Sequence, residues 1–383
     1  MNLDANQSNF LEYIFYGTYF LAGLPVGYIL KRNGFKKTLY FGLLVSASSV
    51  VPMIYGVRNM SYEFIVAGVF VLGAGFTFLQ VVCNPFVIFM GKPSNGAAEL
   101  SGAGAYNSFG TWIAPLLGTL IATVAIPDDL YTVADIQTHK LEATVLPYVL
   151  IAVIFVGLAV RVHYSDLPTL DNFKDIGTNV KGDEGKKYVV QYKHLMLGAV
   201  AIFFYVGAEV AIYEQMREFI ITHLQIARLK DSLSYILVYY WGGAMVGRFI
   251  GFSALKEVSR QKALLFCSVI AMLLVLLSIN TPGQGAMFFI LAVGLFNSIM
   301  WPVIFEMGIH GLGRHSIYGS VILVMGVVGG AIIPFITNYV ESKIGVDYSL
   351  YVPVACYLFI IYYAIHGHKY KSKGELDTKG DIS

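Results

Sequence analysis

Long apolar runs alternate with short polar connectors along the whole chain. A bilayer crossing needs about 20 mostly apolar residues, and about eleven runs of that kind can be marked. The pattern therefore predicts an all-α membrane protein of about eleven transmembrane helices. The expected spans are residues 11–30, 38–57, 62–90, 99–125, 145–162, 194–222, 233–255, 262–280, 284–309, 315–340 and 348–367.

Composition supports a membrane environment. Of the 383 residues, 56% are hydrophobic and only 13% are charged, whereas about a quarter of the residues in soluble domains are charged. The net charge of +2 is not gathered into a basic patch, so no nucleic-acid partner is expected. Cys83, Cys267 and Cys356 lie inside apolar runs without metal-binding spacing, and we expect neither a metal nor another cofactor.

Basic residues in the connectors indicate the orientation, because Lys and Arg are enriched in cytoplasmic loops. They follow the first, fifth and seventh spans and recur in the tail, with Arg228 and Lys230 as the exception. We expect an inner-membrane protein with its C-terminus in the cytoplasm. The residues concerned are Lys31, Arg32, Lys36, Lys37, Lys174, Lys181, Lys186, Lys187, Lys193, Lys256, Arg260, Lys262, Lys369, Lys371 and Lys373.

Similar segments recur at a nearly constant offset, which indicates two homologous halves. The matching pairs are Gly27 with Gly247 (247−27=220), Pro85 with Pro302 (302−85=217) and Pro115 with Pro334 (334−115=219). We expect an N-terminal bundle at 1–165, a cytoplasmic linker at 166–193, a C-terminal six-helix bundle at 194–368 and a cytoplasmic tail at 369–383. The span at 194–222 has no repeat partner within the chain, so the first of twelve helices is expected to be missing. Two six-helix halves around a midplane site is a known transporter architecture.

Charged residues interrupt the apolar run from Phe203 to Ile220. Tyr205, Glu209, Tyr213 and Arg217 recur every four residues and share one helical face. Ionisable groups at bilayer depth are costly and usually face a bundle interior or a cavity. Glu209 is therefore a candidate to bind substrate, to bind Na+ or to take up a proton. The alternative is a buried ion pair of Glu209 or Tyr213 with Arg217 that only fixes helix packing.

Side-chain amides beside prolines form a second group of candidates. Gln80 and Asn84 are four residues apart next to Pro85, and Asn297 stands four residues before Trp301, which precedes Pro302. Amides can bind the polar groups of a substrate, and a proline frees backbone carbonyls that can line a cavity. The alternative for each amide is a hydrogen bond between helices.

The remaining candidates are weighed in the same way. Asn107 and Ser108, before Trp112, suit either a site or helix contacts. Trp301 could stack on a sugar ring, but packing is the commoner role of such an aromatic, as it is for Trp241. Glu306 is expected near the cytoplasmic end, paired with His310, Arg314 or His315.

Six strings lie in order along the chain, at residues 78–87, 106–121, 203–210, 239–251, 295–320 and 327–335, and include FLQVVCNPFV, FFYVGAEV and YYWGGAMVGRFIG. Together they resemble the fucose/galactose/glucose:cation symporter family of the major facilitator superfamily, and are most similar to its bacterial glucose/galactose transporter branch. The resemblance implies the two-bundle superfamily fold, a hexose substrate, a coupling cation and alternating access. We also expect the protein to act as a monomer.

The resemblance leaves the coupling cation open. The fucose branch has a glutamate in the slot that Gln80 occupies here, and an amide cannot exchange a proton near neutral pH. The glucose/galactose branch shares the glutamine and includes sodium-coupled members. Both H+ and Na+ therefore stay possible, with Glu209 as the candidate coupling residue.

The segment GYILKRNGFKK resembles the superfamily's cytoplasmic turn between its second and third helices. It contributes Gly27, Arg32, Gly34 and Lys36 as candidate gating residues, with Arg248 as their repeat counterpart. The alternative is plain anchoring by positive charge on the cytoplasmic side.

The sequence thus predicts a secondary transporter that imports a hexose, either glucose or galactose or else fucose, by cation symport. No HExxH or GxSxG motif or other catalytic set is visible in the spans, so no enzymatic activity is expected. The rival interpretations are a sugar sensor that does not transport, an inactive truncated carrier, and a carrier of another small polar solute.

Overall fold

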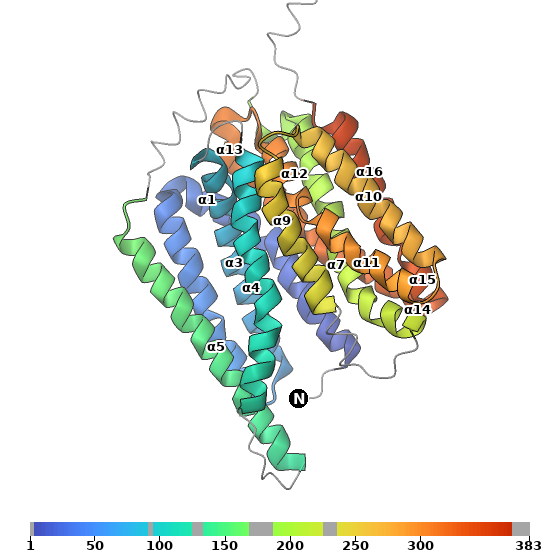
Figure 1. Cartoon of the computed structure of the whole chain (residues 1–383). Helices are drawn as coiled ribbons and strands as arrows, with labels where there is room; N and C mark the ends of the chain where they lie inside the picture. The colour runs from blue at the N-terminus through green and yellow to red at the C-terminus, as the bar shows by residue number, and fades with distance from the viewer. Residues whose placement is uncertain (1–3, 91–94, 125–132, 168–186, 225–235, 370–383) are drawn as a thin grey trace, which may run out of the picture.

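The computed structural model describes residues 4–90, 95–124, 133–167, 187–224 and 236–369, and every element in these ranges is a helix (Figure 1). Within them, eight stretches are long and apolar enough to cross a bilayer. The elements are α1 (Ala5–Ser48), α2 (Val50–Arg58), α3 (Tyr62–Met90), α4 (Gly96–Val124), α5 (Val133–Tyr164), η1 (Val189–Gln191), α7 (Lys193–Leu224), η2 (Ile236–Trp241), α9 (Gly242–Ala254), α10 (Arg260–Asn280), α11 (Gln284–Asn297), α12 (Met300–Ile309), η3 (Gly313–His315), α13 (Ser316–Met325), η4 (Gly326–Val328), α14 (Gly329–Ile344), α15 (Val346–Ser349), α16 (Tyr351–Tyr362) and η5 (Tyr363–Gly367).

The first helical stretch makes two crossings. It runs over 53 residues from Asn6 to Arg58, or about 80 Å at 1.5 Å per residue, against a hydrocarbon core of about 30 Å. Gly34 interrupts it with a φ of 80°, a conformation that glycine adopts without a steric penalty. The Tyr62 hydroxyl donates a hydrogen bond to the carbonyl of Gln7 (2.8 Å), so the chain has returned to its starting side.

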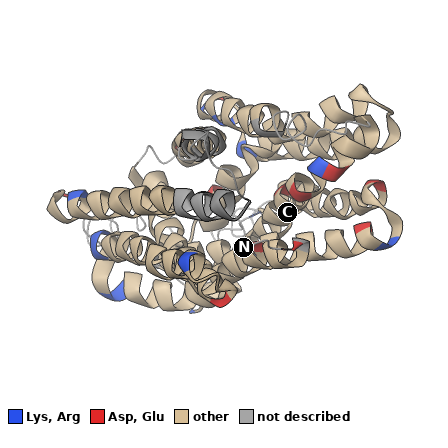
Figure 2. Ribbon diagram, turned by 90° about the horizontal axis from the view of Figure 1, so that it is seen from below, with Lys and Arg blue, Asp and Glu red and all other residues tan. Residues whose placement is uncertain are grey.

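The two ends of the bundle differ in what they contain. We call the end with the Gly34 turn and His368 the tail side. Lys31 lies over the ring of Tyr318 there, at 5.4 Å, and the Tyr363 hydroxyl bonds to the carbonyl of His194. The opposite end carries the start of α1 and the connection between α2 and α3. Figure 2 shows that most of the ribbon carries no charged residue.

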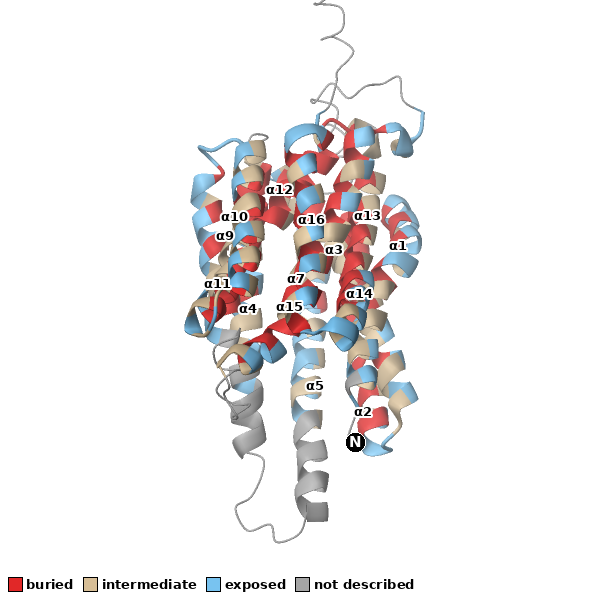
Figure 3. Ribbon diagram, turned by 90° about the vertical axis from the view of Figure 1, so that its right-hand side faces the viewer, coloured by how far each residue is buried: buried red, intermediate tan, exposed pale blue. Residues whose placement is uncertain are grey.

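Two groups of helices, α1–α5 and α7–α16, meet along two seams. At one seam α1 packs on α13, η4 and α14, and at the other α4 packs on α9, η2 and α12. Glycines allow the close approach: a Cβ at Gly27 would lie 2.6 Å from Val321, and one at Gly251 would lie 2.7 Å from Ser101. Figure 3 shows buried residues concentrated on helices such as α7, α12 and α13, whereas the described part of α5 is mostly exposed or half-buried.

The expected boundary between the halves falls largely outside the described residues. The linker was placed at 166–193, and residues 168–186 belong to the part that the structure does not describe. The four-part division of the chain therefore stays a prediction, as does the tail beyond residue 369.

Candidate functional site

Glu209 lies at the middle of the 32-residue helix α7, with the carboxylate half-buried near the seam. The Tyr205 hydroxyl, one turn away, donates a hydrogen bond to Oε1 of Glu209 (2.9 Å). Arg217, the partner in the packing interpretation, is exposed. The buried pair with Arg217 is therefore not what the structure contains. Arg248 is the basic residue close enough to act on the Glu209 carboxylate, but no ion pair joins these two described residues.

Arg248 joins the two groups of helices. Its Nη1 donates to the carbonyl of Gly104 (3.0 Å) and to Oγ of Ser108 (2.7 Å), both on α4. Its Nε donates to the carbonyl of Ser298 (3.2 Å), next to the end of α11. We expected Arg248 as the counterpart of a cytoplasmic gating turn, and the structure places it inside α9 instead. A guanidinium carries five fixed N–H donors, which suits it to bind several acceptors at once.

Asn297 adds an amide at the same depth. It ends α11, near the middle of the stretch Gln284–Ile309, and is fully buried. The Tyr357 hydroxyl donates to its Oδ1 (2.7 Å). Its Nδ2 faces the Tyr240 hydroxyl but has no hydrogen-bond partner of good geometry. Buried polar atoms are almost always paired, so this unpaired donor makes Asn297 a candidate to bind a solute.

Two tyrosines join these residues into one cluster. Tyr240 donates to the backbone carbonyl of Glu209 (3.3 Å), and Tyr357 donates to the side chain of Asn297. We call Tyr205, Glu209, Tyr240, Arg248, Asn297 and Tyr357 the central cluster. Its members come from α7, η2, α9, α11 and α16.

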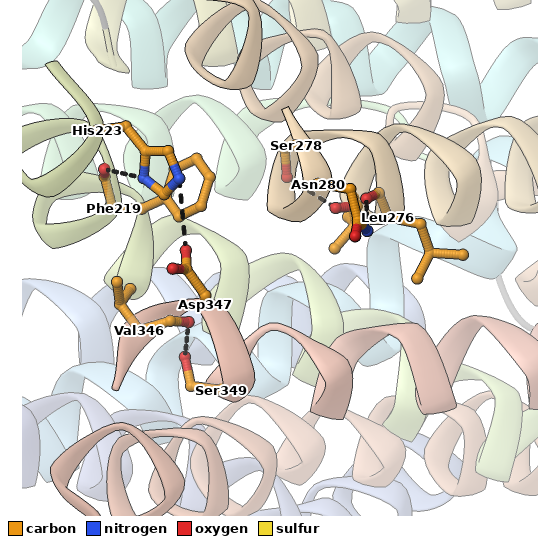
Figure 4. Close-up of polar contacts among 9 residues, drawn as sticks. Phe219, His223, Leu276, Ser278, Asn280, Val346, Asp347 and Ser349 are labelled. Atoms are coloured by element: carbon orange, nitrogen blue, oxygen red, sulfur yellow. Dashed lines mark hydrogen bonds and ion pairs between the residues drawn. The ribbon is translucent and has the colours of Figure 1, made fainter. Parts of the chain in front are cut away.

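Helix α7 is held at both ends, which fixes the position of Glu209. On the tail side, a ring nitrogen of His194 lies 2.9 Å from the carbonyl of His310. On the opposite side, His223 lies 3.6 Å from Asp347 at the start of α15, and its other ring nitrogen is 3.1 Å from the carbonyl of Phe219 (Figure 4). These contacts at both ends of α7 hold the Glu209 carboxylate in a fixed position near the seam.

The first group of helices faces the cluster with α1 and α4. The Tyr16 ring on α1 packs over Gly330 of α14. Ser108 on α4 binds Arg248. The first group of helices therefore contacts the cluster directly through Arg248.

The amides of α3 form their own pair. Asn84 donates from Nδ2 to Oε1 of Gln80 (2.8 Å), with Asn84 buried and Gln80 half-buried. The backbone carbonyl of Val81, the residue after Gln80, accepts a hydrogen bond from the Ser320 hydroxyl of α13 (3.0 Å). This contact places the turn that holds Gln80 against the second group of helices. No described contact links Gln80 or Asn84 to the central cluster, so their role in a common site stays a prediction.

Asn107 and Trp301 also lie outside the central cluster. Asn107 is exposed on α4, one residue before the Ser108 that binds Arg248. Trp301 stacks on Phe305 one turn further along α12, with ring centroids 5.8 Å apart. That contact fits the packing interpretation of Trp301, and neither residue's place in a site is tested.

The candidate gating residues divide between a turn and a helix. Gly34 forms the turn, with exposed Arg32 and half-buried Lys36 beside it. Gly27 lies within α1, two helical turns earlier, where it is buried against Val321. Its position inside a helix differs from the loop that we expected.

Glu306 has a different partner from the one expected. Its carboxylate pairs with Arg260 at the start of α10, whereas we expected His310, Arg314 or His315; nothing is described of the Arg314 side chain. Glu306 is 3% exposed, and its Oε2 has no hydrogen-bond partner. We predicted partners close to Glu306 in sequence, because the sequence alone does not show that α10 packs against α12.

The cluster can bind a polar molecule without covalent chemistry. It offers a carboxylate acceptor, an unpaired amide donor, tyrosine hydroxyls and a guanidinium, with tyrosine rings as apolar surfaces. No group of three or more His, Cys, Asp or Glu residues able to hold a metal ion occurs within the described ranges. The arrangement suits a neutral polyhydroxylated solute or a small cation.

Sequence reasoning missed part of this cluster. Tyr240 and Tyr357 were not singled out, because a tyrosine in an apolar run carries no periodic signal of its own. Arg248 was grouped with a loop, although it lies within the apolar run 233–255. An arginine at that depth was itself the signal, because such residues are rare and usually functional.

Comparisons with known proteins identify the class. The sequence model described as Major Facilitator Superfamily matches residues 1–334. The chain is 36% identical over 367 residues to the glucose/galactose transporter of Brucella abortus biovar 1 (strain 9-941), covering 96% of this chain and 87% of that one. It is 27% identical to the L-fucose-proton symporter of Escherichia coli (strain K12), over 94% of this chain and 84% of the other.

Solved structures agree on the fold. A crystal structure of a single-residue variant of the E. coli fucose:proton symporter, FucP, superposes with a TM-score of 0.81 at 22% identity, over 96% of this chain and 92% of that one. The chain belongs to the major facilitator superfamily, a class of membrane transporters. The fold and the family resemblance expected from the sequence are thereby confirmed.

Proposed function

We propose that this protein is a secondary transporter that takes up a hexose together with a cation, either H+ or Na+, across the bacterial inner membrane. The names of its relatives support a sugar: glucose and galactose for the Brucella protein and L-fucose for the E. coli protein. Within the chain, the observation that carries the proposal is the central cluster. It gathers a carboxylate, a guanidinium and an unpaired amide at mid-membrane depth where the two groups of helices meet.

The chemistry of the cluster supports binding of a sugar. A pyranose presents hydroxyls that both donate and accept, together with an apolar face, and its site combines a few placed polar groups with aromatic surfaces. Nδ2 of Asn297 can donate to such a hydroxyl, and the Glu209 carboxylate can accept from one. The rings of Tyr213 and Trp241, 5.3 Å apart beside Tyr240, supply aromatic surface nearby.

Coupling is assigned to Glu209. A carboxylate can take up a proton or bind Na+, and either event changes the net charge beside Arg248. The bonds from Arg248 to Gly104 and Ser108 cross between the groups of helices. Cation binding at Glu209 would therefore alter the contact that holds α9 against α4.

Alternating access follows from the two seams. Rocking of one bundle against the other around a fixed midplane site is the general mechanism of such folds. The close packing of Gly27 on Val321 and of Gly251 on Ser101 lies toward the tail side of the cluster. We place the tail side in the cytoplasm, because Lys31, Arg32 and Lys256 lie there.

Uptake by proteoliposomes tests the proposal. Purified protein is reconstituted, a Na+ or H+ gradient is imposed, and accumulation of labelled glucose, galactose and fucose is measured. We expect one of the cations to drive accumulation of at least one hexose, and Asn297→Ala to raise the apparent KM. Binding of sugar without accumulation or counterflow would favour a sensor, and no hexose binding at all would favour another solute.

A further inference from the structure

An apolar groove of about 620 Å³ opens beside the seam between α1 and α13. Its walls come from α1, η1, α7, α13 and η4, and every lining side chain is aliphatic, aromatic or thioether, with one hydroxyl from Tyr318. Phe20 and Leu24 are 52% and 61% exposed on its rim. In a membrane protein, such a surface at this depth is in contact with lipid and not with water.

The groove faces away from the core of the bundle. On α13 it is lined by Tyr318, Val321 and Met325, which share one face of the helix. Ser320, on the other face, bonds to the carbonyl of Val81 in α3. The groove therefore looks outward from the protein and is separate from the central cluster.

Its length matches one leaflet. From Tyr318 to Val328 the groove follows about 15 Å of helix axis at 1.5 Å per residue, which is half of a hydrocarbon core of about 30 Å. The segment Val189–Gln191 closes its tail-side end, where Tyr188 and Val190 are exposed. Exposed tyrosines are typical of the interface between lipid and water.

Three lysines surround the tail-side end. Lys31 lies 5.4 Å from the centre of the Tyr318 ring, and Lys187 lies 5.4 Å from the centre of the Tyr188 ring. Lys193 is exposed at the start of α7, on the same helical face as Met196 and Val200, which line the groove. The wall-forming segments 20–33, 187–204 and 316–328 contain no Asp or Glu.

We propose that this groove is a binding site for an anionic phospholipid of the tail-side leaflet, with an acyl chain in the groove and the headgroup phosphate between Lys31 and Lys193. Basic residues flanking a hydrophobic slot between membrane helices are a recognised arrangement for acidic lipids. Because the groove spans the contact between α1 and α13, the bound lipid touches both groups of helices. The bound lipid therefore stabilises the arrangement of the two groups of helices in which α1 and α13 both contact the acyl chain.

Native mass spectrometry of the purified protein tests the proposal directly. Phosphatidylglycerol and phosphatidylcholine with identical acyl chains are titrated against wild type, Lys31→Gln/Lys193→Gln, Val200→Trp and Lys256→Gln. Lys256 serves as the matched control, because it is an exposed tail-side lysine that lies over Phe252 on α9, away from the groove. Monodisperse elution and an unchanged helical circular dichroism spectrum establish that each variant is folded.

We expect wild type and Lys256→Gln to bind phosphatidylglycerol in preference to phosphatidylcholine. The double variant should lose about fivefold in affinity for each lysine, or about twenty-five-fold, for phosphatidylglycerol alone. Val200→Trp should weaken both lipids, because the indole fills the groove. Equal binding of the two lipids by wild type, or a double variant that matches Lys256→Gln, would overturn the headgroup assignment. Undiminished binding by Val200→Trp would overturn the groove.

Discussion

Replacing Arg248 with methionine tests how the two groups of helices are held together. The substitution removes three hydrogen bonds, to Gly104, Ser108 and Ser298. It also removes a positive charge that acts on the Glu209 carboxylate. Hydrogen bonds from a charged group contribute about 1.5–3 kcal/mol each, and these three are partly buried.

The energies of hydrogen bonds from one side chain are not additive, so we expect Arg248→Met to lower the free energy of unfolding by about 3–5 kcal/mol, less than the sum of the three bonds. The double variant Arg248→Met/Glu209→Gln should recover part of that loss, because it no longer contains a carboxylate without a nearby positive charge. Thermal unfolding of the purified proteins in one detergent, followed by circular dichroism, measures both effects.

Arg217→Met is the matched control, since Arg217 is an exposed arginine on α7, and its unfolding temperature should match wild type. An Arg248→Met protein as stable as wild type would refute the role given to the bonds across the seam. A double variant no more stable than the single one would refute the electrostatic pairing with Glu209.

Two further substitutions probe the tail side. Gly27→Val should reduce sugar uptake by tenfold or more while sugar binding persists. A Cβ at this position would lie 2.6 Å from Val321, so the larger side chain keeps the seam from closing. Wild-type uptake would show that this seam does not close tightly during transport. Arg260→Ala should lower the free energy of unfolding by about 3 kcal/mol or more, because it leaves the buried Glu306 carboxylate unpaired, whereas Lys262→Ala on the same helix should have little effect; equal unfolding temperatures for the two variants would contradict the pairing.

The helical membrane fold followed from the sequence because its signal is local. Each crossing needs its own apolar run, and internal similarity then indicated two halves. The sequence predicted a connector near Gly34 between the first two spans, but it did not predict how short this connector is. Only the backbone shows that one glycine with positive φ connects two crossings without a loop.

The candidate site was predicted in part. Glu209 and Asn297 were identified because a carboxylate or an amide inside an apolar run is rare, and the structure brings both into the central cluster. The identity of their partners depends on which helices are neighbours. Arg248, 39 residues after Glu209, and Tyr357, 60 residues after Asn297, could be paired with them only once the helices were packed. The same reason explains the wrong partner assigned to Glu306.

The most direct test of the account compares Glu209→Gln with Glu218→Gln in proteoliposomes. Both residues lie on α7, but Glu218 is exposed near its outer end. We expect Glu218→Gln to accumulate labelled hexose as wild type does. Glu209→Gln should lose accumulation driven by the cation gradient while it still exchanges labelled for unlabelled sugar. Gradient-driven accumulation by Glu209→Gln at the wild-type level would contradict the claim that this carboxylate couples cation and sugar.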